Sequence, residues 1–227
     1  MAIWFALMLG AYILGSVPPA YLAAKLFRGI DLRQCGTGQV GGGNLWRMTS
    51  WKFGLPAGIF DLGKGLVMVW VAQLVGLTIA QQIVVGLAAI IGHNWSIFLR
   101  FSGGRGIGTT MGVVFILPLV NAMAPWVTVA FFSILIGGTL ILRSSPLPVF
   151  LAVASLPLIS GFYESLSVAL AFLAVFLIIA VRRLISPRTV EAASISRGQL
   201  LLNRLFFDRD IKDRKFWMYR KPAKTGK

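Results

Sequence analysis

The sequence has few of the residue types from which most catalytic and metal sites are built. Its 227 residues include one cysteine, Cys35, and one histidine, His93. A lone cysteine excludes an intrachain disulfide, and the lone histidine argues against a metal site of clustered Cys and His ligands. Hydrolase signatures such as G-x-S-x-G and H-E-x-x-H are also missing. We therefore expect no metal and no cofactor, and a reaction that needs little help from a protein base.

Charged residues are scarce as well, at 13% of the chain, whereas about a quarter is usual for soluble proteins. Hydrophobic residues make up 57%, the mean hydropathy is +0.80, and the apolar residues fall in long blocks. A helix needs about 20 such residues to cross the hydrocarbon. The sequence predicts an all-α membrane protein of about seven transmembrane helices, at residues 3–26, 53–77, 79–98, 107–123, 126–142, 148–162 and 166–181.

The few charges are strongly biased, with 22 Lys and Arg against seven acids. The cations cluster in alternate connections, 27–52, 99–106 and 143–147, and in the tail after residue 181, while the other connections carry none. Because Lys and Arg mark the cytoplasmic side, this predicts an outside N-terminus and an inside tail. The first span has no cation before Lys25, so we expect it to be retained as a multi-pass anchor in the cell (inner) membrane.

Composition changes near residue 186, where a polar, basic segment begins. We expect a transmembrane unit over residues 1–185 and a cytoplasmic basic tail over 186–227. The tail mixes cations with apolar residues, which is typical of an interfacial helix on anionic lipid. Nucleic acid is the rival partner for a net charge of +15, but the charge follows membrane sidedness, so we expect none.

The most informative segment is the polar loop at residues 36–47, GTGQVGGGNLWR, between two apolar runs. Its glycines allow tight turns and close approach of a ligand to backbone N–H groups. Thr37, Gln39 and Asn44 add a hydroxyl and two amides, and Arg47 adds a planar cation suited to phosphate. This pattern predicts a site for a phosphorylated molecule. A flexible glycine linker is the alternative, whereas a dinucleotide fold lacks the strand it requires.

A second glycine cluster lies in the third connection, on the same predicted side. His93 comes before it, and Gly103-Gly104-Arg105-Gly106 opens the next span. Free N–H groups at a helix start favour an anion, and Arg105 adds a full charge there. The alternative is a cytoplasmic arginine among glycines that serve helix packing. His93 by itself is more typical of a hydrogen-bonded packing residue.

Two ionisable residues fall inside the second predicted span. Asp61 and Lys64 are spaced i, i+3, so they can pair on one helix face. Ionisable groups within a span are costly and are default functional candidates. A mutual structural ion pair explains them equally well.

These motifs resemble the bacterial acyl-phosphate:glycerol-3-phosphate acyltransferases, an integral-membrane family of lipid biosynthesis with seven spans and an outside N-terminus. The likeness runs from Gly15 to about Gly112. It rests on G-S-[IV]-P at residues 15–18, D-[IL]-R at 31–33, G-S-G-N-x-G-A-x-N-x-x-R at 36–47, D-x-x-K-G at 61–65 and G-H-x-[FW]-x-[IV]-F-x-x-F-x-G-G-K-G at 92–106.

The resemblance implies that an acyl phosphate donates its fatty acyl group to glycerol 3-phosphate, giving lysophosphatidate and phosphate. Such a donor is already activated, and a substrate phosphate takes the hydroxyl proton. Arg47 and Arg105 resemble the family's phosphate-binding arginine and lysine, while Thr37 and Gln39 stand for its serine and asparagine. The implied catalytic residues are Thr37, Gln39, Arg47 and Arg105. Substrate-binding residues are Gly36, Gly38, Gly41, Asn44, His93, Gly103, Gly104 and Gly106, and supporting residues are Ser16, Asp61 and Lys64.

The chain departs from the family after its last span. The family carries H-x-x-N-[IL]-x-R there, and residues 182–188 of this chain, RRLISPR, contain neither histidine nor asparagine. Three interpretations follow: Arg182 or Arg183 substitutes as a phosphate ligand, the acceptor differs, or activity is lost. The alternatives to an acyltransferase are a relative that only binds phosphorylated lipid precursors and an organic-phosphate transporter. For all of these functions we expect a monomer.

Overall fold

The computed structural model describes residues 1–186, 189 and 192–220, and every regular element in this part is a helix. The predicted all-α class is thus confirmed. Pro187, Arg188 and the last seven residues lie outside the described part. The helices are α1 (Ala2–Ser16), α2 (Pro19–Arg28), α3 (Gly42–Met48), α4 (Trp51–Leu74), α5 (Ile79–Asn94), the short 3-10 helix η1 (Ile97–Leu99), α6 (Ile107–Val120), α7 (Trp126–Leu142), α8 (Pro146–Tyr163), α9 (Leu166–Leu184), α10 (Arg197–Phe207) and α11 (Arg214–Met218).

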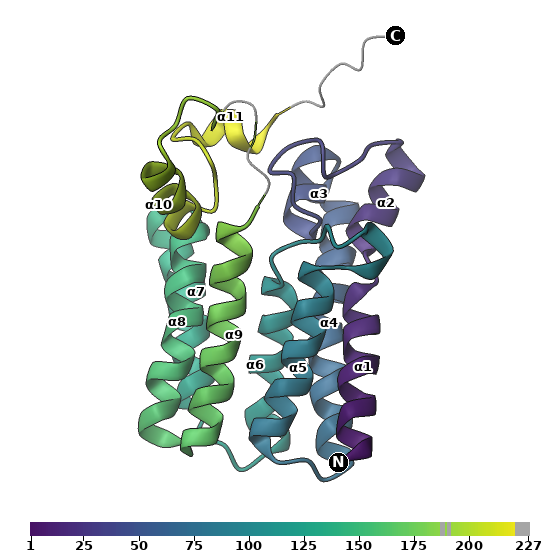
Figure 1. Cartoon of the computed structure of the whole chain (residues 1–227), viewed down its shortest axis with the longest axis vertical. Helices are drawn as coiled ribbons and strands as arrows, with labels where there is room; N and C mark the ends of the chain where they lie inside the picture. The colour runs from purple at the N-terminus through teal and green to yellow at the C-terminus, as the bar shows by residue number, and fades with distance from the viewer. Residues whose placement is uncertain (187–188, 190–191, 221–227) are drawn as a thin grey trace.

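Five segments of the described chain are long and apolar enough to cross a membrane. They are Ala2–Arg28, α4, Ile79–Leu99, α8 and α9, and the apolar helices α6 and α7 are shorter. All seven run along one bundle, in which α1, α4, α5 and α6 pack together beside α7, α8 and α9 (Figure 1). The count of seven spans and the orientation of the termini remain predictions.

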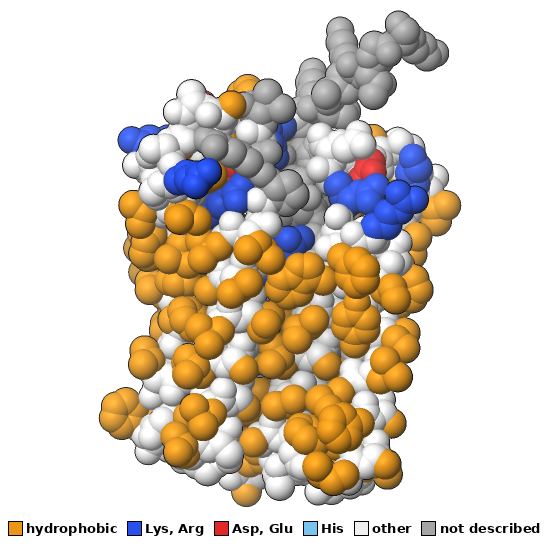
Figure 2. All heavy atoms as spheres, in the orientation of Figure 1, with side chains coloured by type: hydrophobic (Ala, Val, Ile, Leu, Met, Phe, Trp, Pro, Cys, Tyr) orange, Lys and Arg blue, Asp and Glu red, His pale blue; other side chains and the backbone are white. Residues whose placement is uncertain are grey.

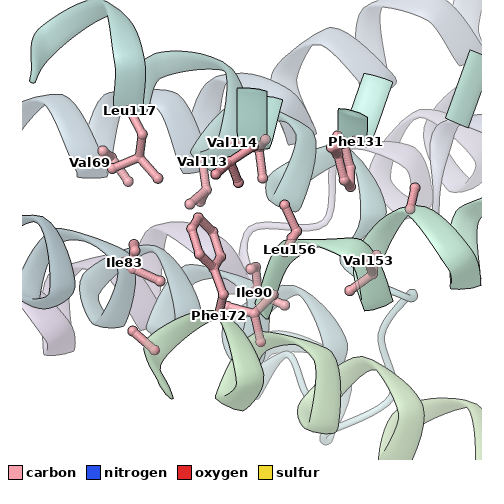
Figure 3. Packing of buried hydrophobic residues seen from close by; sticks show 14 of the residues in the cluster. Val69, Ile83, Ile90, Val113, Val114, Leu117, Phe131, Val153, Leu156 and Phe172 are labelled. Atoms are coloured by element: carbon pink, nitrogen blue, oxygen red, sulfur yellow. The ribbon is translucent and has the colours of Figure 1, made fainter. Parts of the chain in front are cut away.

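One apolar core joins the two groups of helices. Phe172 of α9 is buried against residues of α4, α5, α6 and α8 (Figure 3). On the face seen in Figure 2, apolar side chains cover the length of the bundle, and Lys and Arg side chains gather at the end that carries α3, α10 and α11. The N-terminus lies at the opposite end (Figure 1). The cationic loops therefore share one end of the bundle.

The first predicted span is interrupted at Val17 and Pro18, where α1 ends and α2 begins at a second proline. Proline removes a helical donor and frees the carbonyls of the preceding turn. Lys64 Nζ donates to the carbonyls of Gly15 at 3.1 Å and Val17 at 2.5 Å, and Ser96 Oγ donates to the Ser16 carbonyl at 2.5 Å. Lys64 of α4 and Ser96, just before η1, thus satisfy the groups that the break exposes, as a membrane interior requires.

Lys64 also forms an ion pair with Asp61 at 2.8 Å, and both side chains are buried. All three protons of its ammonium group therefore have an acceptor. Asp61 Oδ1 lies 3.3 Å from Nδ1 of His93 on α5. The two ionisable residues of the second span are therefore paired, and they tie α1, α4 and α5 together.

Replacing Lys64 with Met is expected to destabilise the protein by about 3–5 kcal/mol, because buried Asp61 loses its cationic partner and the carbonyls of Gly15 and Val17 lose their donor. Thermal unfolding of detergent-purified protein measures the loss. Lys52→Met, an exposed cation on the same helix, is the matched control and should unfold like the parent. A Lys64 variant as stable as this control contradicts the structural role of the pair.

Candidate active site at the cationic end of the bundle

The first glycine loop is folded around the buried side chain of Asn44. Its Nδ2 donates to the carbonyls of Leu32 at 3.3 Å, Cys35 at 3.1 Å and Gln39 at 3.0 Å. Its Oδ1 accepts from the N–H of Thr37 at 3.1 Å. The structure therefore places Asn44 inside the loop, where it shapes the backbone and leaves the neighbouring side chains to face the cavities.

Glycine is required at positions where this loop turns. Gly36 and Gly38 have φ angles of +56° and +72°, a region that side chains rarely adopt. A Cβ on Gly36 would also collide with the amide oxygen of Asn44. A flexible linker needs no such contacts, so this loop has a defined conformation and is not a linker.

The second glycine cluster packs directly on His93. Gly104 N–H donates to the His93 carbonyl at 3.1 Å, and a Cβ on Gly104 would collide with the His93 ring. On its other side the cluster is held by Arg182, whose guanidinium donates to the carbonyls of Gly103 at 3.0 Å and Gly104 at 3.1 Å. Gly106 then adopts a φ of +71° as α6 begins.

The two arginines at the position where the family carries H-x-x-N have different surroundings. Arg182 lines a cavity and stacks on Trp95, with 5.6 Å from its guanidinium carbon to the ring centre. Arg183 is buried, and donates to the carbonyls of Leu205 at 2.7 Å and Pro146 at 2.9 Å. Arg183 therefore ties α9 to α8 and α10, and only Arg182 faces the candidate site.

An acid from the tail connects the two glycine clusters. Asp208 accepts from Arg105 Nε and from Gln39 Nε2, each at 2.7 Å. Arg105 also donates to the Arg182 carbonyl at 3.1 Å. Sequence reasoning missed Asp208, although a rare acid in a basic tail was a signal. Asp208 thereby joins Gln39 of the first glycine loop to Arg105 of the second.

Three cavities adjoin the contact of Asp208 with Arg105 and Gln39, and Gln39 lines all three. The largest, of about 480 Å³, lies beneath the tail. We call it the basic cavity, because six arginines line it: Arg33, Arg105, Arg182, Arg204, Arg209 and Arg220.

Besides Arg105, which binds Asp208, two more of those arginines are paired with an acid. Arg204 lies 2.7 Å from Asp210, and Arg33 lies 2.6 Å from Asp31. The hydrogen bond from Arg33 holds the pKa of the Asp31 carboxyl below its usual value. A net positive potential remains in the cavity.

The second cavity, of about 440 Å³, is an apolar groove between α3, α4 and α6. Gly58, Leu62 and Met111 line it along its length, and Gln39 and Arg105 line it as well. We call it the apolar groove. His93 and Asp61 also border it, so the two loops, the ion pair and the groove adjoin one another.

The third cavity, of about 140 Å³, contains Arg47 and Thr37, and we call it the small cavity. The Nε of Arg47 and the Oγ1 of Thr37 are buried there without a hydrogen-bond partner among the described residues. Burial lowers the pKa of Arg47 from its usual value, and the positive charge of Arg214 acts in the same direction. Arg47 and Arg105 thus line different cavities, which share Thr37, Gln39, Asp208, Arg209 and Trp217.

The family profile described as "Glycerol-3-phosphate acyltransferase" matches residues 5–188. A relative named glycerol-3-phosphate acyltransferase 4, from Dehalococcoides mccartyi (strain CBDB1), is 40% identical over 96% of this chain and 95% of its own. A glycerol-3-phosphate acyltransferase from Thermus thermophilus is 41% identical over 54% of this chain and 60% of its own.

A solved structure is also similar. It is an integral membrane glycerol 3-phosphate acyltransferase in its glycerol 3-phosphate form, with a TM-score of 0.71 and 30% identity. The match covers 80% of this chain and 88% of the other. Helical membrane architecture is therefore common to both proteins.

Replacing Asp208 with Ala is expected to loosen the tail, because Asp208 joins it to Gln39 and Arg105. Trypsin should then cut the segment around Lys212 several times faster than in the parent protein. The control is Glu164→Ala, an acid at the other end of the bundle, which should leave the cleavage rate unchanged. Equal rates in both variants would show that the tail is held by other contacts.

Proposed function

Because the chain belongs to the glycerol-3-phosphate acyltransferase family, we propose that it transfers a fatty acyl group from an acyl phosphate to glycerol 3-phosphate where the three cavities adjoin. Lysophosphatidate and phosphate are the products, which places the enzyme in phospholipid biosynthesis. The observation that carries this proposal is that Gln39 lines an apolar groove and two cationic cavities at once. A fatty acyl phosphate has the same division between a long apolar chain and a charged head.

The apolar groove suits the acyl chain of the donor. Trp46, Leu55 and Ile59 line it and are 54%, 47% and 60% exposed, so it opens sideways from the bundle. In a membrane this side faces lipid, so the chain passes from the bilayer into the groove without exposing its CH₂ groups to water, which would cost about 0.8 kcal/mol each. The donor chain enters from the bilayer, and its head group reaches Arg105.

The cationic cavities suit the two phosphates. Both substrates are anions, so bringing them together requires fixed cations and N–H donors. Arg105 faces the donor's phosphate, while Arg47 and Thr37, with their free donor atoms, face the phosphate of the acceptor. The backbone N–H groups of Gly41, Gly103 and Gly106 add further donors, whereas Gly36, Gly38 and Gly104 serve by shape because their N–H groups are bonded to carbonyls of the chain.

The reaction then needs no covalent enzyme intermediate. The primary hydroxyl oxygen of glycerol 3-phosphate attacks the acyl carbonyl carbon and forms the ester bond. The bond between that carbon and the phosphate oxygen breaks, phosphate leaves, and a substrate phosphate oxygen takes the hydroxyl proton. Arg105 stabilises the charge that develops on the leaving phosphate.

The supporting residues act by position in this proposal. Asn44 holds the first loop, and Asp61 and Lys64 hold the break after Ser16 against α4. His93 supports the second loop through its contacts with Gly104 and Asp61. Each keeps a cation or an N–H donor in its place at the edge of a cavity.

We further propose that the enzyme works as a monomer in the inner membrane; the two glycine loops, the helices beside them and the tail of the same chain are enough to line the three cavities. The tail helix α10 buries Leu200 against the bundle and leaves Leu201, Leu202 and Phe207 exposed. With the surrounding cations, this exposed face suits the surface of an anionic leaflet.

Replacing Arg105 with Lys is expected to lower kcat/KM by about 100-fold, because lysine keeps the charge but loses the paired contacts to Asp208 and the Arg182 carbonyl. Lysophosphatidate formation in lipid vesicles measures it, with acyl phosphate and acyl-CoA compared as donors. Arg28→Ala, an exposed cation at the same end, serves as the control. Unchanged turnover in the Arg105 variant contradicts the site assignment, and preference for acyl-CoA contradicts the donor.

Replacing Gly58 with Leu is expected to raise the KM for long-chain acyl phosphates more than for short ones. Gly58 lines the apolar groove with no atom within 4 Å of an added Cβ, so the new side chain fills the groove. Gly63→Leu is the matched control, since Gly63 is an equally open glycine of α4 that does not line this groove. If both variants respond alike to chain length, the groove does not hold the acyl chain.

A further inference from the structure

The small cavity is closed by the tail. Its wall includes Thr37, Gln39 and Arg47 from the first loop and Ser144 and Ser145 from the connection between α7 and α8. Apart from Pro146 of α8, the remaining wall is supplied by the chain after α9: Phe207, Asp208, Arg209, Arg214, Trp217 and Met218. The family profile ends at residue 188, so this part of the cavity lies beyond what the family match describes.

Four residues that line the small cavity carry buried hydrogen-bond donors without partners in the described part of the chain, and all of these except Arg47 also line the adjoining basic cavity. In the first loop they are Thr37 Oγ1 and Arg47 Nε, and in the tail they are Arg209 Nε and Trp217 Nε1. All four atoms are buried and have no partner among the described residues, and Trp217 is only 6% exposed. Buried donors are almost always paired, so four such donors around one cavity indicate a ligand that accepts hydrogen bonds.

The charges of the cavity also require an anion. Arg47, Arg209 and Arg214 line it together. Burial lowers the pKa of Arg209, as it does for Arg47, and Arg214 acts on both in the same direction as a like charge. Asp208 is the acid in the wall, and its two oxygens are already bonded to Arg105 and Gln39.

We propose that Arg209, Arg214 and Trp217 bind the phosphate group of the acceptor, together with Arg47 and Thr37. The tail thereby forms part of the acceptor site. This inference rests on the proposed function and assigns the small cavity to glycerol 3-phosphate. A cavity of about 140 Å³ has room for a phosphate group and none for a fatty chain. The Dehalococcoides relative matches 96% of this chain, so that match includes most of the tail.

Steady-state kinetics of the full-length protein in lipid vesicles tests the assignment. Arg209→Gln and Trp217→Phe should each raise the KM for glycerol 3-phosphate, by about 10-fold for the lost charge and less for the lost indole N–H. The KM for acyl phosphate should stay unchanged. Lys215→Gln, an exposed cation of α11 outside the cavity, is the matched control and should leave both constants unchanged.

Binding of inorganic phosphate to the purified protein, measured by calorimetry, separates this inference from the proposed function. Binding that is weakened in Arg209→Gln but not in Lys215→Gln supports the site even if no acyl transfer is found. An active parent whose Arg209 and Trp217 variants keep the KM for glycerol 3-phosphate overturns the inference. A KM that rises for acyl phosphate instead also overturns it, because the cavity then belongs to the donor.

Discussion

Backbone groups freed inside an apolar bundle must find a hydrogen-bond partner, and the site depends on how this chain meets that constraint. Lys64 satisfies the carbonyls at the break between α1 and α2 and binds Asp61, which contacts His93. The His93 carbonyl accepts from Gly104, and the Gly104 carbonyl accepts from Arg182. The Arg182 carbonyl accepts from Arg105, and Arg105 binds Asp208. One polar network therefore runs from the first span to the tail.

This network also lies between an apolar groove and a cationic cavity. Gly58 and Met111 mark an apolar groove on one side, and Arg182 and Arg209 mark a cationic cavity on the other. Arg105 lines both. A transferred acyl group must leave a charged phosphate while its chain stays in an apolar environment, so its carbonyl belongs at such a boundary. Low dielectric on the groove side strengthens the pull of the arginine on developing charge.

Local patterns in the sequence predicted much of the fold and a first outline of the site. Helix α7 has the predicted limits, 126–142, because its apolar run is uninterrupted and bounded by proline and arginine. The roles of Asn44 and Asp208 were beyond such patterns. Asn44 reads as a ligand in the motif, yet the fold uses both its amide atoms within the loop. Asp208 lies 169 positions from Gln39 in the chain, and no local spacing brings the two together.

The tail explains how a site can persist without the histidine and asparagine that the family resemblance leads one to expect after the last span. Helix α9 ends at the same end of the bundle as both glycine loops, so any segment that follows it lies within reach of them (Figure 1). What phosphate binding demands is a cluster of fixed donors, and these need not come from one helix end. Arg182 supports the second loop from α9, and the tail supplies Arg209 and Trp217 to the small cavity. The geometry of the cationic end, more than one particular motif, therefore determines which residues meet the acceptor.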